Sequence, residues 1–193
     1  QDFVDKKRAL GKIEDVAIKL SFYNLLNKNK LNFTKIVLQN AEINFDLHEL
    51  KKYKKFFEKK FSSKPINLKK GEINFFNGEK DIATIKDIKF KYKTSKNTEE
   101  AILKGNFLND DIYINLKNKK KDNNLSRVFI LKLLDTKTKV DVFNSSLDKN
   151  IISGNVSFKK GKNRLTSIFD YKDDQIIFKQ ANLRNAFLDG KFD

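Results

Sequence analysis

Apolar residues alternate with polar ones along most of the chain. Typical runs are Val16 to Phe22 and Ile112 to Leu116, in which nearly every second residue is bulky and apolar. Alternation with a period of two places the apolar side chains on one face of an extended strand. Short clusters of Asn, Asp, Ser, Lys and Gly separate the runs. The pattern therefore predicts a mainly β chain in which neighbouring strands pair antiparallel, as in a meander.

The alternation slips by one residue at several places. Residues 38–45 read LQNAEINF and residues 178–187 read FKQANLRNAF, so that in both stretches the next apolar residue comes three positions later instead of two. A β-bulge explains such a slip, because one extra residue returns the apolar side chains to the same face and increases the local twist. Repeated bulges favour a long, twisted, curved antiparallel sheet. The slips are Leu38 to Ala41, Ile85 to Ile88, Phe178 to Ala181 and Leu183 to Ala186.

Turn-forming residues divide the strands. Asn77-Gly78 predicts a tight hairpin turn, since both residues accept positive φ. The cluster 109–111 (NDD) predicts a second turn, and the Lys-rich segment 117–124 (KNKKKDNN) predicts a solvated loop. Residues 127–134 (RVFILKLL) fit either a buried strand or a short helix. A recurring motif, in which a glycine stands two residues before an apolar residue, is expected to open strands at Gly105, Gly154 and Gly190.

One segment has the period of a helix. In residues 48–61 (HELKKYKKFFEKKF) apolar residues recur at spacings of three and four, with lysines on the other side. This spacing predicts an amphipathic helix near 47–61, with Asp46 as its N-cap and Pro65 beyond its end. The helix either covers an edge or end of the sheet or lies on a membrane surface through its lysines. Its apolar stripe consists of Leu50, Tyr53, Phe57 and Phe61.

The charge raises nucleic-acid binding as a second interpretation. The formal net charge is +16 and comes almost entirely from lysine, the only arginines being Arg8, Arg127, Arg164 and Arg184. Proteins that read a DNA sequence rely on the planar fork of Arg, so the lysine excess disfavours that function. The chain contains no run of 18 apolar residues that could form a membrane-spanning helix. It has no Met and ends within an alternating stretch, so we expect it to be a piece of a longer polypeptide.

Little in the chain points to catalysis or metal binding. It has no Cys and a single histidine, His48, at the start of the predicted helix. Acidic pairs such as 110–111 and 173–174 fall in predicted turns, where carboxylates accept local hydrogen bonds. No Gly-rich phosphate loop and no serine nucleophile motif is present. The sequence therefore predicts a non-enzyme with no catalytic residue, no metal site and no cofactor.

The order of these elements resembles the AsmA-like family of bacterial envelope proteins. A strand ending in LSFYNLLNK is followed by LNFTKIVLQNAEINFDL, the helix, INLKKGEINFFNGEKDIATIKDIKFKYK and LKGNFLNDDIYINLK. Gly71-Glu-Ile73, together with Ile85-Lys-Asp-Ile88-Lys-Phe90, is similar to the family's glycine strand and its returning strand with spaced apolar residues. The resemblance runs from about residue 12 to the end of the chain.

The resemblance implies a single β-groove module over residues 1–193, a taco-shaped half-barrel with an apolar inner face and the helix 47–61 inserted between strands. It also implies a periplasmic location, within a longer protein anchored to the inner membrane. The implied role is transport of phospholipid between membranes during outer-membrane biogenesis. The implied partners are phospholipid, other envelope proteins and, through residues 48–61, a membrane surface.

The inward apolar residues of such a groove are the candidate lipid-binding residues. Two other interpretations stay open. The 18 phenylalanines could instead fill the closed core of a purely structural β spacer, and the lysines could serve a basic β protein that binds nucleic acid, or only protect strand edges and solubilise the outer face. Parity along the strands selects as lipid-binding residues Ile18, Leu20, Ile36, Leu38, Ile43, Phe45, Ile73, Phe75, Ile88, Phe90, Leu183 and Leu188.

Overall fold

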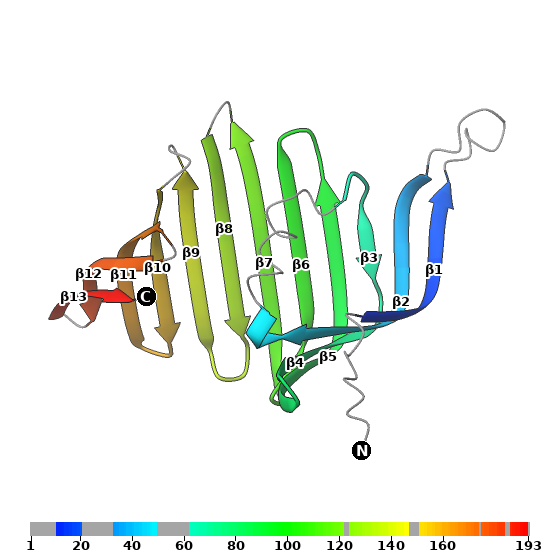
Figure 1. Cartoon of the computed structure of the whole chain (residues 1–193), viewed down its shortest axis with the longest axis horizontal. Helices are drawn as coiled ribbons and strands as arrows, with labels where there is room; N and C mark the ends of the chain where they lie inside the picture. Colours follow the sequence, from blue (N-terminus) through cyan, green and yellow to red (C-terminus); the bar gives the residue numbers. More distant parts are fainter. Residues whose placement is uncertain are drawn as a thin grey trace, which may run out of the picture. The chain divides into compact units, whose positions relative to one another are not determined.

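The chain is mainly β, and its strands pair mostly antiparallel, as the alternation predicts. A computed structural model describes residues 11–20, 33–49, 62–121, 124–146, 151–173, 175–183 and 186–192 (Figure 1). The chain divides into two compact units. Unit 1 comprises Gln1–Phe90 and Gly105–Asn109, and unit 2 comprises Lys91–Lys104 and Asp110–Asp193.

The long strand β2 (Phe33–Asp46) is the centre of unit 1. Strand β1 (Gly11–Leu20) pairs with it antiparallel on one side. On the other side β3 (Ile66–Leu68) and β4 (Gly71–Asn77) pair with it in parallel. The first part of β5 (Lys80–Thr94) then returns antiparallel to β4 (Figure 1).

The parallel pairing corrects the expectation of a purely antiparallel meander. Ile36 lies opposite Ile66 and Ala41 opposite Gly71, so β3 and β4 follow β2 with one constant offset, as a single strand bent at residues 69–70. Parallel neighbours require the chain to return to the same end of the sheet between them. The long segment between β2 and β3 permits that return, whereas the short separators from β4 onward enforce antiparallel hairpins.

The amphipathic helix predicted near 47–61 falls mostly outside the described residues. Its start, Leu47–Glu49, forms a short 3₁₀ helix (η1) instead of an α-helical turn, and residues 50–61 lie outside the described part. The described ranges contain no α-helix and no helix able to cross a bilayer. Asp46 does cap η1, since the amide of His48 donates a hydrogen bond to its Oδ1 at 2.9 Å. The amide of Gly78 donates to the same oxygen at 3.3 Å, which ties η1 to the β4–β5 turn.

That turn is shifted by one residue from its predicted position. Asn77 pairs with Lys80, so the two central residues are Gly78 and Glu79. Gly78 has a positive φ of 64°, and Glu79 does not. A glycine in the first central position is typical of a type II′ turn, whereas the predicted Asn-Gly centre is typical of type I′. The hairpin itself is confirmed.

The slips of the alternation coincide with residues in the left-handed backbone conformation. Asn40 has a φ of 51°, Asp87 of 51° and Gln180 of 52°, and each lies between the two apolar residues of its slip. At Gln180 the register of β12 shifts against both of its neighbours, as expected for a bulge. A non-glycine residue in this region carries a conformational cost, so the chain adopts it only where the surroundings require it.

Asn40 differs from Gln180, because its neighbouring strand β1 slips at the same level. Ile13 pairs with Ala41 and Val16 pairs with Leu38, so β1 also takes three residues where two would be regular, and the register is unchanged. The amides of Lys69 and Ala41 use carbonyl groups beside the bend, with the Lys69 amide 3.0 Å from the Leu38 oxygen. The backbone groups freed by the bend therefore keep hydrogen-bond partners.

At two of these irregular places a glycine in the neighbouring strand approaches the backbone closely. A Cβ atom at Gly105, near the end of β6 (Thr98–Phe107), would lie 2.7 Å from the carbonyl oxygen of Lys86, next to Asp87. A Cβ atom at Gly71 would lie 2.6 Å from the carbonyl oxygen of Ala41, next to Asn40. Approach this close requires a residue without a side chain, so each glycine and the irregular strand beside it depend on each other.

Unit 2 is an antiparallel meander. From β7 onward each strand is hydrogen-bonded to the next one in the chain (Figure 1). Residues 98–104 of β6 precede this series within the unit. The strands are β7 (Asp110–Lys121), β8 (Asn124–Leu133), β9 (Thr138–Ser146), β10 (Ile152–Lys160), β11 (Asn163–Lys172), β12 (Gln175–Leu183) and β13 (Ala186–Phe192).

The structure decides one expectation that had two alternatives, for segment 127–134, and differs from three others. Segment 117–124 is largely strand instead of loop, because β7 continues until Lys121 pairs with Asn124. Segment 127–134 belongs to a strand, apart from its last residue, and not to a helix. The slip from Leu183 to Ala186 is a hairpin, in which these two residues pair across the β12–β13 connection. Of the three predicted strand-opening glycines, Gly105 and Gly190 lie toward the ends of their strands and Gly154 lies near the start of β10.

A buried carboxylate fixes the loop between β8 and β9. Asp110, at the start of β7, is 5% exposed. Its carboxylate accepts hydrogen bonds from the amides of Asp135 (2.8 Å) and Thr136 (3.1 Å) and from the Thr136 hydroxyl (2.7 Å). Burial by itself would raise the pKa of Asp110, but these hydrogen bonds outweigh it and hold the pKa below the ordinary value of an aspartate.

Substitution of Gly105 by Ala should destabilise unit 1 by about 3 kcal/mol, because the new Cβ meets the Lys86 carbonyl oxygen and must push the strands apart. Gly161→Ala is the control. Gly161 also resists a side chain through its positive φ of 57°, but it has open space around it, so about 1 kcal/mol is expected. Urea unfolding followed by far-ultraviolet circular dichroism measures both. Equal losses in the two variants would show that Gly105 is not a close-contact position.

Substitution of Asp110 by Asn should lower Tm at pH 7, because an amide cannot accept all the hydrogen bonds that the carboxylate accepts. The lowered pKa means that the carboxylate stabilises the fold above the unfolded-state pKa of about 3.9 and loses this effect as the pH falls further. The difference in Tm between the wild type and Asp110→Asn should therefore shrink below about pH 4. Asp111→Asn, on the exposed neighbouring side chain, should leave Tm unchanged at both pH values. A constant difference across this pH range would contradict the assignment.

Candidate functional site

One face of unit 1 carries rows of apolar side chains that run across the strands. Residues directly opposite each other in paired strands lie on the same face of a sheet. The rings of Phe45 and Phe75 stack at 6.0 Å with 19° between their planes. We call this the apolar face of unit 1. Its rows are Ile18–Ile36–Ile66, Val16–Leu38–Leu68, Ile43–Ile73–Ile85 and Phe45–Phe75–Ala83.

The irregular place in β5 keeps this face continuous. The Cβ position of Gly105 lies 3.0 Å from Ile85 Cγ2 and 3.3 Å from Ile88 Cγ1. Both side chains therefore point to the same side of β5, although three positions separate them and strict alternation would place them on opposite sides. This is the outcome that the slipped alternation predicts.

Unit 2 has an apolar face of the same kind. Val140 is opposite Leu131 on one side and Phe158 on the other, and the row continues to Leu165. Farther along the strands Phe169 and Phe178 pair edge to face at 6.4 Å. We call this the apolar face of unit 2. Its rows are Ile114–Leu131–Val140–Phe158–Leu165, Leu116–Phe129–Val142–Val156 and Gly154–Phe169–Phe178.

These faces lack a second layer in the described part of the chain, and much of their surface stays in contact with water. Val16 is 60% exposed and Ile18 57% in unit 1, and Phe158 is 39% exposed in unit 2. In the described part of the chain the buried apolar residues are few: Val37, Ala41, Leu68, Ile85, Ile88, Tyr92, Ile112 and Ala181.

The candidate lipid-binding residues of unit 1 fall into three groups. Ile18 and Leu20 are exposed on β1. Most of the others are half-buried and lie in the rows above or just beyond them. Ile88 is 1% exposed, so it supports the sheet and offers no surface to a ligand. The half-buried group is Ile36, Leu38, Ile43, Phe45, Ile73, Phe75 and Phe90.

The candidates in the last two strands are placed only by their backbone. Leu183 pairs with Leu165 and Leu188 pairs with Ala181, and the side chains of both leucines lie outside the described part. The site prediction omitted the rows of β7 to β11 altogether. The sequence signal for them is the same alternation that selected the residues of unit 1.

The opposite face of unit 1 is polar. Asn74 donates through Nδ2 to Asn44 Oδ1 at 3.2 Å and to Glu42 Oε1 at 3.3 Å. Its own Oδ1 accepts a hydrogen bond from the Thr84 hydroxyl at 2.9 Å. This network joins β2, β4 and β5 side by side. The two faces of unit 1 therefore differ in chemistry, as expected of a sheet with one apolar and one wet side.

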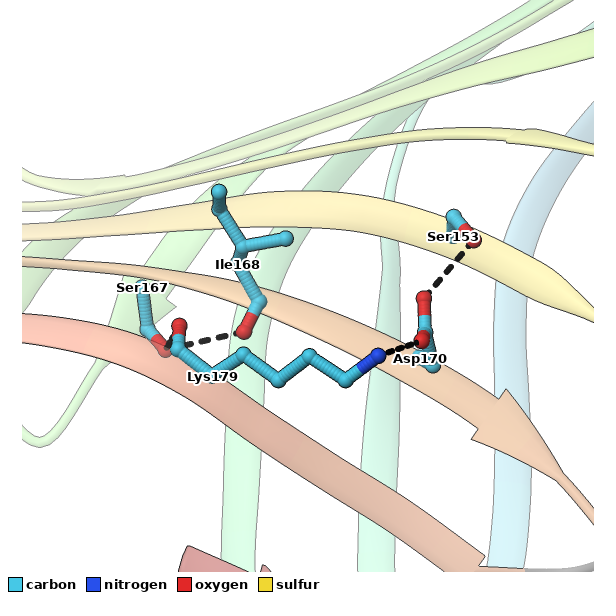
Figure 2. A network of polar contacts seen from close by, with 5 residues as sticks. All are labelled: Ser153, Ser167, Ile168, Asp170 and Lys179. Carbon is cyan, nitrogen blue, oxygen red and sulfur yellow. Dashed lines mark hydrogen bonds and ion pairs between the residues drawn. The ribbon is translucent and has the colours of Figure 1, made fainter. Parts of the chain in front are cut away.

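The opposite face of unit 2 has a charged network of its own (Figure 2). The Lys179 ammonium and the Ser153 hydroxyl, 2.7 Å away, both donate hydrogen bonds to Asp170. The hydrogen bond from Lys179, with a smaller contribution from Ser153, holds the pKa of Asp170 below its ordinary value against the opposing effect of burial. The network links β10, β11 and β12.

Figure 2 also shows how the bulge of β12 is satisfied. Ser167 is the residue of β11 that the register shift leaves without a direct partner in β12. Its side chain is buried, 5% exposed, and its hydroxyl lies 3.2 Å from the carbonyl oxygen of Lys179 and 3.1 Å from that of Ile168. The hydroxyl thus donates to a carbonyl group at the bulge, a role that the sequence analysis did not assign to Ser167.

The described ranges hold no group of three or more His, Cys, Asp or Glu side chains placed to bind a metal ion. His48 is exposed at η1, where its amide and not its ring makes the capping contact. What the arrangement offers chemically is extended apolar surface on each unit, with a polar side-chain network on the opposite face.

No known family, curated protein or solved structure matches the chain. The case for a function therefore rests on the residues described above.

Proposed function

We propose that the chain is a non-enzymatic module that binds phospholipid acyl chains on the apolar faces of its sheet. The observation that supports this most directly is the exposure of apolar rows that a stable soluble domain would normally cover. Val16 and Ile18 are each more than half exposed although they belong to continuous apolar rows. A ligand with long apolar chains removes such surface from water without any directional chemistry.

The energetics of this interaction are sufficient. Each buried methylene is worth about 0.8 kcal/mol, so about ten methylenes contribute about 8 kcal/mol before the cost of ordering the chain. The rows run across several strands, and an extended acyl chain can lie along them. No hydrogen-bonding group is required along the chain, which fits rows that consist almost entirely of aliphatic and aromatic residues.

The finer parts of the proposal rest on the resemblance to the AsmA-like family. They are a sheet curved into a half-barrel groove, a periplasmic position in a longer protein anchored to the inner membrane, and transport of phospholipid between the two membranes. The bulge at Gln180 supports curvature, because a bulge increases the local twist and bends the strand. The further proposed partners are other envelope proteins and, through residues 48–61, a membrane surface.

Phe158→Asp should reduce the phospholipid bound per chain about fivefold, because the substitution places a charge within an apolar row of unit 2. Ser157→Asp is the matched control, since it adds the same charge in the same strand but on the opposite face. The measurement is mass spectrometry of lipid extracted from chains purified without detergent. Dye-labelled fatty acid provides a second readout.

Three results would contradict the proposal. The wild-type chain could carry no lipid and fail to bind the fatty acid, as a purely structural spacer would. The Ser157→Asp control could lose as much lipid as Phe158→Asp, which would detach binding from the apolar face. Phe158→Asp could also retain the lipid of the wild type while folding normally by circular dichroism.

A further inference from the structure

A row of basic side chains crosses one end of unit 2 on the face opposite the apolar one. Lys132 is directly opposite Lys139, Lys139 is opposite Lys159, and Lys159 is opposite Arg164. Each of these pairs is the next-to-last of its ladder, so the row lies beside the β8–β9 loop and the β10–β11 turn. Tyr113 of β7 continues the row beyond Lys132.

This row of cations lowers the stability of the fold. Like charges directly opposite each other in a sheet repel, and four cations in sequence across four strands multiply the effect. Among the described side chains Asp141 pairs with Lys139, at 2.7 Å, and the other cations of the row form no ion pair. Arg164 donates a hydrogen bond to the neutral hydroxyl of Ser157, at 3.3 Å. An anionic partner bound at this end would therefore relieve the repulsion between these cations.

An exposed leucine lies at the same end. Leu134, in the β8–β9 loop, is 53% exposed. Hydrogen bonds nevertheless hold the loop in place. The amide of Leu134 donates to the Asp111 carbonyl oxygen at 3.0 Å, and the Asp110 carboxylate accepts from the amides of the next two residues. The amide of Gly161 donates to the Lys137 carbonyl oxygen at 3.4 Å, which joins the β10–β11 turn to the same loop. The outward position of Leu134 is therefore part of an ordered loop.

We infer that this end of unit 2 docks on the surface of a membrane that contains anionic phospholipid. Lys132, Lys139, Lys159 and Arg164 would contact the headgroup phosphates, and Leu134 would enter the boundary between headgroups and acyl chains. A basic surface with a protruding apolar residue is the combination that binds anionic interfaces. This docking goes beyond the proposed function and is independent of it, since it uses the opposite face and a loop tip instead of the apolar rows.

The details favour a membrane over a nucleic acid. The ring of Tyr113 is the aromatic group in line with the row, and the ammonium groups of Lys104 and Lys132 lie 5.9 Å and 5.5 Å from its centroid. A ring held by two cations is poorly placed to stack on bases, on which single-strand binding depends. An exposed leucine in a rigid loop gains nothing from a phosphate backbone, whereas it gains from insertion into lipid.

The test is co-sedimentation of the complete chain with vesicles. Vesicles of phosphatidylcholine with one third phosphatidylglycerol are compared with vesicles of phosphatidylcholine alone, at low and at physiological salt. Binding should require the anionic lipid and weaken as salt rises. The double variant Lys132→Glu, Lys159→Glu should bind at least about tenfold more weakly. Leu134→Ser should bind about fivefold more weakly, with an unchanged salt dependence.

A matched control separates position from net charge. Lys117→Glu, Lys119→Glu makes the same change of charge on the same face of unit 2, toward the other end of β7, and should retain most of the binding. The Lys132→Glu, Lys159→Glu variant places each carboxylate opposite Lys139, so it should fold at least as stably as the wild type. Loss of vesicle binding with an undiminished Tm is the expected pair of results.

Several outcomes would overturn the inference. The control variant could lose as much binding as the double variant, or vesicles without anionic lipid could bind equally well. A single-stranded oligonucleotide could bind the row while vesicles do not, which would assign it to nucleic acid. Acyl-chain binding is measured separately on the same variants. If the Lys132→Glu, Lys159→Glu variant binds fatty acid normally but no longer binds vesicles, both proposals are supported. If the wild-type chain binds fatty acid but does not bind anionic vesicles, the docking inference alone is wrong.

Discussion

The structure depends on one constraint: each strand must keep its apolar side chains on the same side while its backbone bends. A strand with regular alternation cannot bend sharply and keep its apolar side chains on one side. At three places the chain therefore has one left-handed residue, namely Asn40, Asp87 and Gln180. Each costs conformational energy. The neighbouring strands compensate with a glycine that allows close approach, as at Gly105, or with a hydroxyl that satisfies a carbonyl group, as at Ser167. The apolar faces exist because these local solutions hold.

The two faces of each unit have different roles. Polar ladders such as Asn44–Asn74–Thr84 and the Asp170 network supply cross-strand contacts without a second layer. Parts of the apolar rows stay in contact with water, as at Val16, Ile18 and Phe158. A sheet stabilised from its polar side can keep its apolar side available, and that availability is what the proposed binding of acyl chains requires. The basic end of unit 2 adds a place for the lipid surface itself.

The sequence predicts the local features better than the long-range ones. Alternation identifies the strands, and three slips in it mark Asn40, Asp87 and Gln180 correctly, because side-chain parity is a local property of the backbone. The parallel pairing of β2 with β3 and β4 is not foreseeable, since it depends on where the chain returns after a long connection. Segment 117–124 has the composition of a loop, because lysine and asparagine favour solvent, yet the exposed end of a strand accommodates such side chains equally well.

The candidate site shows the same limit. Parity selects residues of one face, but it cannot separate an enclosed residue such as Ile88 from an exposed one such as Ile18, since burial depends on the neighbouring strands. It also gives no sign of the row from Lys132 to Arg164, which forms only once the registers of four strands are known. Charge counts show that cations are numerous, and register shows where they meet.

The most direct measurement of the central claim uses strand β8, which is apolar on both sides. Leu131 belongs to the apolar face, and Ile130 and Val128 belong to the opposite one. Phosphatidylcholine with a spin label on its acyl chain broadens the nuclear magnetic resonance signals of methyl groups that it contacts. If acyl chains bind the apolar face, the methyl signals of Leu131 and Val140 broaden and those of Ile130 and Val128 stay sharp. Equal broadening on both sides, or none on either, would contradict the claim.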